Sequence, residues 1–251
     1  MSFRKRLLTA GIVLGSLASP VFADAYSPAQ ADENSRWYIT AGAQKANIED
    51  LGSDKDNYTI DDDILSTEIE LELENGTGYG VGVGYELGSD LRVELNYTKI
   101  DTEVDWTFFN ATYSGVSAAV GFDTSGDAEA ETFMLSMNKD FPSDGGWTPY
   151  VGAGIGRTNI DVNDVTFDAT ELGDALEVDL GTTTILKGDS NTVWAYQLRG
   201  GIAKDLSNKA SLYAEVNYNV TDGFKGGEGA TEISWDGLRS LGYGVGFRYK
   251  L

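Results

Sequence analysis

The chain has 251 residues, with 18 Lys and Arg against 40 Asp and Glu, and it contains neither His nor Cys. A sequence without these two residue types excludes a Ser-His-Asp triad, zinc and haem sites with His or Cys ligands, and any disulfide. The formal net charge of −22 argues against nucleic acid as a partner, because binding to phosphates requires clustered Lys and Arg.

Residues 1–23 have the pattern of a secretory signal peptide. A basic start is followed by an apolar stretch from Leu7 to Leu17 and by a small-residue cleavage site that ends at Ala23. The apolar stretch, about 11 residues, is too short to span a bilayer as a helix. A buried N-terminal helix is the alternative, but the basic residues have no role in it. We therefore expect a mature domain of residues 24–251.

The mature chain repeatedly alternates apolar and polar residues with period two, the pattern of a β-strand with one apolar face. At the C-terminus, apolar residues at odd positions from Leu241 to Leu251 alternate with Gly, Arg and Lys. Eight segments show the pattern over about 8 to 12 residues, the length of a tilted strand that crosses a bilayer. They start near Trp37, Gly78, Leu91, Thr132, Tyr150, Trp194, Leu212 and Leu241.

Short and long connections alternate between these segments. Tight turns lie near residues 88–90, 142–146 and 207–209, and long connections span about 46–75, 101–131, 158–191 and 222–237. The sequence therefore predicts an all-β fold, an eight-stranded antiparallel transmembrane β-barrel with short periplasmic turns and long extracellular loops.

A soluble eight-stranded ligand carrier is the competing fold, since its strands also alternate. Its exterior would carry many Lys, Glu and Asp, whereas the polar face here carries glycine runs such as Gly78 to Gly84 together with Thr, Asn and Gln. The apolar face has aromatic residues near both strand ends, for example Trp37 and Tyr79. Two aromatic girdles are typical of a membrane barrel.

Three stretches carry a family resemblance: Thr148 to Gly156, Ala195 to Ala203 and Gly244 to Leu251. They resemble the small outer-membrane β-barrel family that includes opacity proteins and bacterial surface antigens. The resemblance covers the mature barrel and implies a Gram-negative outer-membrane location among lipid and lipopolysaccharide, with display at the cell surface.

The resemblance also implies that the terminal strand is read by the barrel-assembly machinery. In that family the last residue is usually Phe, where this chain has Leu251. The residues expected to form the assembly signal are Tyr243, Val245, Phe247, Tyr249 and Leu251.

The acidity is concentrated in the four long connections. They hold 30 acidic residues against Lys55, Lys187 and Lys225, a net charge of −27. Carboxylates from residues 54–63 form a weak candidate for a Ca²⁺ site, although the segment lacks the glycine and terminal Glu of an EF-hand loop. The candidate ligands are Asp54, Asp56, Asp61, Asp62 and Asp63. A solvated, cation-attracting surface is the preferred interpretation, and no cofactor is expected.

Strand parity predicts a set of charged residues inside the barrel. They are Glu86, Arg92, Glu94, Arg199, Glu215 and Arg248, with Lys250 beside them. Buried charges must be paired or hydrated, so they form either a salt-bridge plug or the selectivity ring of a small pore. An eight-stranded barrel is only wide enough for side chains to fill, which favours the plug.

No enzymatic function is expected, because acyl transfer needs a base that is usually His. In the first long connection, Ile69, Leu71 and Leu73 alternate with Glu and share the parity of Tyr79. This parity predicts that strand two extends above the membrane, where it either offers free backbone groups to a surface protein or host ligand or pairs with other loops of the same chain. The predicted function is envelope structure and adhesion-type surface interaction, with a narrow pore for small solutes as the alternative.

Overall fold

The computed structural model describes residues 36–53, 55–60, 63–88, 90–113, 116–143, 145–168, 181–226 and 233–251. The predicted signal peptide lies outside these residues. Within them, no helix has the length and apolar character needed to cross a membrane.

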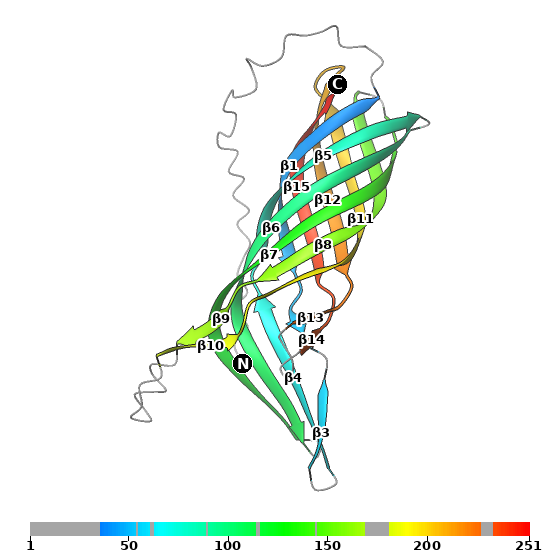
Figure 1. Cartoon of the computed structure of the whole chain (residues 1–251). Helices are drawn as coiled ribbons and strands as arrows, with labels where there is room; N and C mark the ends of the chain where they lie inside the picture. Colours follow the sequence, from blue (N-terminus) through cyan, green and yellow to red (C-terminus); the bar gives the residue numbers. More distant parts are fainter. Residues whose placement is uncertain are drawn as a thin grey trace. The chain divides into compact units, whose positions relative to one another are not determined.

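Eight long strands form the body of the fold (Figure 1). They are β1 (Trp37–Ile48), β5 (Gly76–Gly88), β6 (Leu91–Tyr113), β7 (Val116–Asp140), β8 (Trp147–Val162), β11 (Asp189–Asp205), β12 (Ala210–Thr221) and β15 (Arg239–Lys250). Each of the eight segments expected from the sequence corresponds to one of these strands, because the period-two pattern is strongest where one face is apolar and the other small or polar.

The eight strands pair in a closed antiparallel ring. Each strand pairs with its sequence neighbour among the eight, and β1 pairs with both β5 and β15. In the closing pair Ile39 lies opposite Tyr249, and Ala43 lies opposite Val245. Closure leaves no free sheet edge in the barrel wall, and the predicted eight-stranded barrel is thereby confirmed.

Tight turns join the strands at one end of the ring, which we call the turn end. Gly88 and Asp90 have φ values of 94° and 58° in the β5–β6 turn, and Gly145 and Gly146 have φ values of 79° and 72° in the β7–β8 turn. Such left-handed conformations favour Gly and tolerate Asp, which explains why these residues occupy the turns. The described chain begins and ends here as well, since the Leu251 amide donates to the Trp37 carbonyl oxygen.

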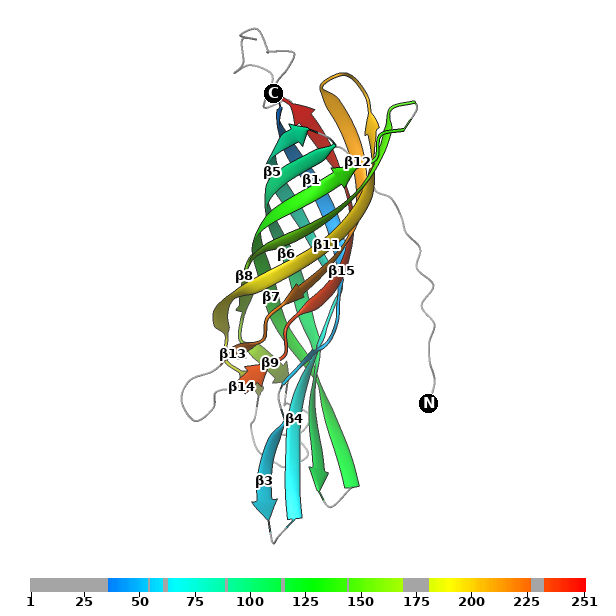
Figure 2. The same cartoon turned by 90° about the vertical axis from the view of Figure 1, so that its right-hand side faces the viewer.

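The opposite end, the loop end, carries further strands from the long connections. They are β2 (Leu51–Gly52), β3 (Asp56–Ile60), β4 (Asp63–Leu73), β9 (Val165–Asp168), β10 (Thr182–Leu186), β13 (Phe224–Gly226) and β14 (Ile233–Trp235). Strands β6 and β7, of 23 and 25 residues, also continue past the ring in this direction. Figure 2 shows them running beside β4 and β3 well beyond the barrel wall.

The two faces of the barrel wall differ in chemistry. Apolar side chains such as Val81, Leu135 and Val245 are about half exposed on the outer face. Aromatic rings gather near both ends of this face, with Trp37 against Tyr85 at a centroid distance of 4.9 Å near the turn end. Near the loop end, Tyr97 packs against Phe133 at 5.1 Å.

Glycine on the inner face makes room for tyrosine rings. A Cβ atom at Gly84 would lie 2.0 Å from Cζ of Tyr38, and one at Gly246 would lie 2.3 Å from Cζ of Tyr213. The glycine runs of the inner face therefore allow large aromatic side chains to fill a narrow lumen.

Candidate functional site

A network of buried charges crosses the lumen near the turn end. Glu94 of β6 lies at its centre, 3.0 Å from Nη1 of Arg92 and 3.0 Å from Nη2 of Arg199. Arg199 also lies 3.6 Å from Glu215 of β12, and Nε of Arg92 donates to Asp140 over 2.9 Å. Each of these arginines therefore has two carboxylate partners from different strands, an arrangement that lowers the cost of burying the charges.

Tyrosines complete the network, and charge-based reasoning from the sequence did not include them. The Tyr38 hydroxyl donates to Glu94 and the Tyr150 hydroxyl donates to Glu215, each over 2.8 Å. The Arg92 guanidinium lies over the Tyr150 ring at 4.6 Å from the centroid, within cation–π range. Each tyrosine has the same parity as the lumen-facing residues of its own strand, so the sequence did hold a signal for them.

The remaining predicted lumen charges do not join these ion pairs. Arg248 is buried and lies over the Tyr38 ring at 5.2 Å, but its Nε has no hydrogen-bond partner among the described residues. Glu86 pairs with Lys250 over 2.7 Å, and both side chains are over one third exposed. The structure therefore places the Glu86–Lys250 pair at the rim of the turn end, away from the central network.

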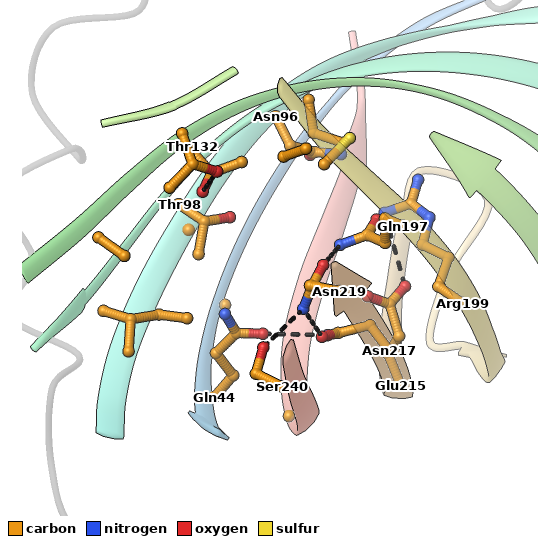
Figure 3. Close-up of a pocket in the computed structure, with 18 of the residues that line it drawn as sticks. Gln44, Asn96, Thr98, Thr132, Gln197, Arg199, Glu215, Asn217, Asn219 and Ser240 are labelled. Carbon is orange, nitrogen blue, oxygen red and sulfur yellow. Dashed lines mark hydrogen bonds and ion pairs between the residues drawn. The ribbon is translucent and has the colours of Figure 1, made fainter. Parts of the chain in front are cut away.

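A chamber lies between this network and the loop end. Its volume is about 130 Å³, and Glu94, Arg199 and Glu215 form its charged floor. Side-chain amides and hydroxyls line its walls, and Figure 3 shows Gln44, Gln197, Asn217 and Asn219 pointing toward one another. Neighbouring amides are hydrogen-bonded, as from Gln197 to Asn219 over 2.9 Å. The chamber has room for several water molecules or one small polar solute.

Apolar residues adjoin the chamber at the loop end. Leu51, Leu71, Val104, Val165 and Trp235 form a buried cluster, and partly buried apolar side chains pack around it. These five residues come from all four long connections, so the loops together make one apolar cap. Backbone contacts hold the loops to one another, including the bond from the Asp236 amide to the Gly52 carbonyl oxygen over 2.9 Å.

The β4 segment is a separate strand and not a continuation of β5, the strand that carries Tyr79. Shared parity with Tyr79 predicts an extension of strand two here, but Leu71 is buried in the apolar cap, and Ile69 and Leu73 pack against it. The strand is interrupted between β4 and β5, where the Glu74 amide donates to the Glu103 carbonyl oxygen over 2.9 Å. This interruption changes which positions face inward, so odd-numbered residues face inward in β4 and outward in β5.

Strand β4 also does not offer the free edge that a strand-addition template requires. It pairs with β6 along one edge and with β2 and β3 along the other. The alternative expectation, pairing with another loop of the same chain, is the one observed.

The proposed cation ligands are largely outside the described part of the chain. Asp54, Asp61 and Asp62 are not described, and of Asp56 and Asp63 only the backbone is described, in β3 and β4. Among the described residues, no three acidic, His or Cys side chains gather to hold a metal ion.

The expected assembly residues all belong to the last strand or directly follow it. Tyr243, Val245, Phe247 and Tyr249 face outward from β15, and Leu251 is exposed at its end. Phe247 stacks beside Tyr249 with ring centroids 6.4 Å apart. An apolar and aromatic strip of this kind is accessible on the outer face of the terminal strand.

Comparison with protein families identifies the barrel. Residues 13–250 match the model of the outer membrane protein beta-barrel domain. The chain belongs to this family. The barrel is therefore an outer-membrane one, with its turn end in the periplasm and its loop end outside the cell.

Several solved structures are similar to the chain at low sequence identity, and one of them, OprG, has a TM-score above 0.5. OprG, an outer membrane protein of Pseudomonas aeruginosa, is 15% identical with a TM-score of 0.53, and the match covers 88% of this chain and 98% of that one. Neisserial surface protein A is 17% identical with a TM-score of 0.49, over 86% and 98% of the two chains. Ail of Yersinia pestis is 12% identical with a TM-score of 0.39, over 85% and 97%. Among curated proteins, no sequence matches the chain.

Proposed function

We propose that this outer-membrane protein is a non-enzymatic surface-interaction protein, with a closed lumen and a contact surface outside the cell. The observation that carries the proposal is the length of β6 and β7. Their mutual pairing continues to Tyr113 opposite Val116, whereas pairing between β7 and β8 ends at Ala128 opposite Val162. The part of the β6–β7 sheet that lies beyond the barrel wall is not needed to span the membrane.

The lumen supports a structural role for the barrel itself. Paired arginines and carboxylates fill it near the turn end, and the apolar cap covers it at the loop end. A hydrated ion passing through the barrel would have to cross the apolar cap and break the ion pairs, and both steps are costly. With no His or Cys in the chain, the usual bases and thiol nucleophiles are also missing.

A narrow pore is the second candidate, and the chamber of about 130 Å³ is the observation that favours it. Movement of the apolar cap alone would open this chamber to the outside. Passage into the periplasm would additionally require the charge network to separate.

Two measurements test the proposal. Refolded protein in planar bilayers should give no reproducible conductance steps. A variant in which an Asn-Gly turn replaces residues 106–123 should still form a heat-resistant barrel, because the replaced segment lies beyond the ring. Cells displaying this shortened variant should adhere less to cultured epithelial cells and to one another than cells displaying the wild type.

Reproducible single-channel steps in the wild type would support the pore instead. Undiminished adhesion by the shortened variant, at equal surface levels, would show that the projecting sheet is not the contact surface.

A further inference from the structure

One face of the projecting sheet combines carboxylates with two aromatic rings. Across the strands, Glu72 of β4 lies opposite Trp106 of β6, which lies opposite Asp123 of β7. In the adjacent row, Glu70 lies opposite Phe108, which lies opposite Gly121. Cross-strand partners share one face of a sheet. We call these six residues the acid-aromatic face.

The two rings form a continuous aromatic surface on this face. Trp106 and Phe108 are stacked with centroids 6.1 Å apart and an interplanar angle of 20°. The Phe108 ring occupies space above β7 that only glycine leaves free, since a Cβ atom at Gly121 would lie 2.6 Å from the ring. Trp106 is 37% exposed, so its ring is available to a ligand.

Carboxylates predominate around the two rings. Lys55 lies 3.5 Å from Glu68, the next residue in the β4 row, and shows that an ammonium group fits against this row. Among the described residues, Glu70, Glu72 and Asp123 have no such ion pair. Partial burial and then the neighbouring Asp50, Asp105 and Glu70 raise the pKa of Glu72 above its ordinary value. A cation placed here would gain both carboxylate contacts and cation–π contacts, which are strongest with Trp.

The same sheet has an unpaired edge in β7. Residues Val116 to Asp123 pair with β6 on one side, and no described residue pairs with them on the other. This stretch contains neither Pro nor Lys, the residues that commonly prevent an edge strand from pairing with another chain. An extended segment added along this edge would lie next to Gly121 and Asp123, with alternate side chains on the acid-aromatic face.

We propose that the edge of β7 takes up an extended basic segment of a partner protein, whose Lys or Arg side chains lie on the acid-aromatic face. This inference deepens the proposed surface interaction and rests on it. A second copy of the chain is disfavoured as the occupant, because each copy carries a net charge of −27 in its long connections. Like charges brought together in this way oppose association.

The experiment uses the full refolded protein in detergent micelles and a fluorescent ten-residue peptide of alternating Lys and Val. Fluorescence anisotropy at low salt should show binding, while a peptide of alternating Glu and Val should not bind. The E70Q/E72Q variant should bind the basic peptide about tenfold more weakly, and Trp106→Ala about threefold more weakly.

The matched control is D161N/D236N, which removes two exposed carboxylates from other connections. It has the same net charge as E70Q/E72Q, so it should lose at most about twofold in affinity if position rather than total charge governs binding. A basic peptide with every backbone nitrogen methylated should lose binding, because it cannot donate to the edge of β7.

Equal binding to E70Q/E72Q and D161N/D236N would overturn the assignment of the acid-aromatic face. Unchanged binding of the methylated peptide would overturn strand addition, and cross-linked dimers that disappear in the shortened variant would assign the edge to a second copy. If the shortened variant loses adhesion while any of these results is obtained, the surface role stands and only the partner chemistry is wrong.

Discussion

Glu94 shows how a carboxylate is kept in the interior of a membrane barrel. Its two oxygens accept hydrogen bonds from Tyr38, Arg92, Asn96 and Arg199 over 2.8 to 3.0 Å. Two of these donors are cations, and the other two satisfy lone pairs that the arginines leave. Such full pairing is what makes a buried charge tolerable, whereas loss of one partner leaves the others unpaired.

Arg199→Ala should therefore destabilise the barrel by about 3 to 5 kcal/mol, because Glu94 and Glu215 would lose a shared cation. The measurement is urea unfolding of refolded protein, followed by loss of the heat-resistant band on gels. Lys55→Ala is the control, since its side chain is 66% exposed and surface ion pairs contribute about 0 to 1 kcal/mol. Equal unfolding midpoints for the two variants would contradict a structural role for the network.

Parity in the sequence assigns the lumen charges to one face but does not select their partners. It gives no reason why Arg248 stacks on Tyr38 while Arg92 pairs with Asp140, because partner choice depends on the stagger between strands. Asp140 is the last residue of β7 and belongs to the turn end, where parity carries little information. The aromatic part of the network was predictable in principle, since Tyr38 and Tyr150 have lumen parity.

At the scale of strands, the sequence locates the eight ring strands but underestimates the length of two of them, β6 and β7. The expected loop from 101 to 131 is largely β6 and β7. A β-bulge between Val104 and Trp106 explains the difference. It shifts the alternation by one residue, so that Val104 and Thr107 are both buried while Trp106 is exposed. A strict period-two search stops at such a shift.

The terminal strand β15 provides a test at the same scale. Phe247→Ala and Tyr249→Ala should each lower the amount of folded barrel in the outer membrane and leave unfolded chain in the periplasm. The reason is that both rings lie on the accessible outer face of the strand expected to be read during assembly. The measurement compares heat-resistant protein in membrane and periplasmic fractions.

Leu241→Ala is the control for that test, since it removes a similarly exposed apolar side chain from the other end of the strand. Normal levels of folded barrel in both aromatic variants would show that β15 is not the signal.

At the scale of the whole molecule, the loop end is strongly acidic and the turn end is not. An Asp- and Glu-specific protease should cut the protein on intact cells, because the long connections hold 30 acidic residues. Trypsin should cut far less, since those connections hold only three lysines and Lys204 and Lys209 lie at the periplasmic turn end. Fragment masses from treated cells provide the measurement. Cleavage at Lys209 in intact cells would contradict the orientation.

The ion pair between Arg199 and Glu94 has a consequence for how the barrel is completed. In the ring, β7 and β8 lie between the strands that carry these two residues. In an open sheet, three strand spacings would hold the two strands about 14 Å apart. The charged atoms are 3.0 Å apart only because the sheet has curled. Tyr38 reaches the same carboxylate from the opposite direction, across β5. A half-closed intermediate thus exposes unneutralised arginines and carboxylates on its concave side and must keep them in water. Curvature of the sheet and neutralisation of these lumen charges are therefore coupled, because the partners of Glu94 come from strands on both sides of β6.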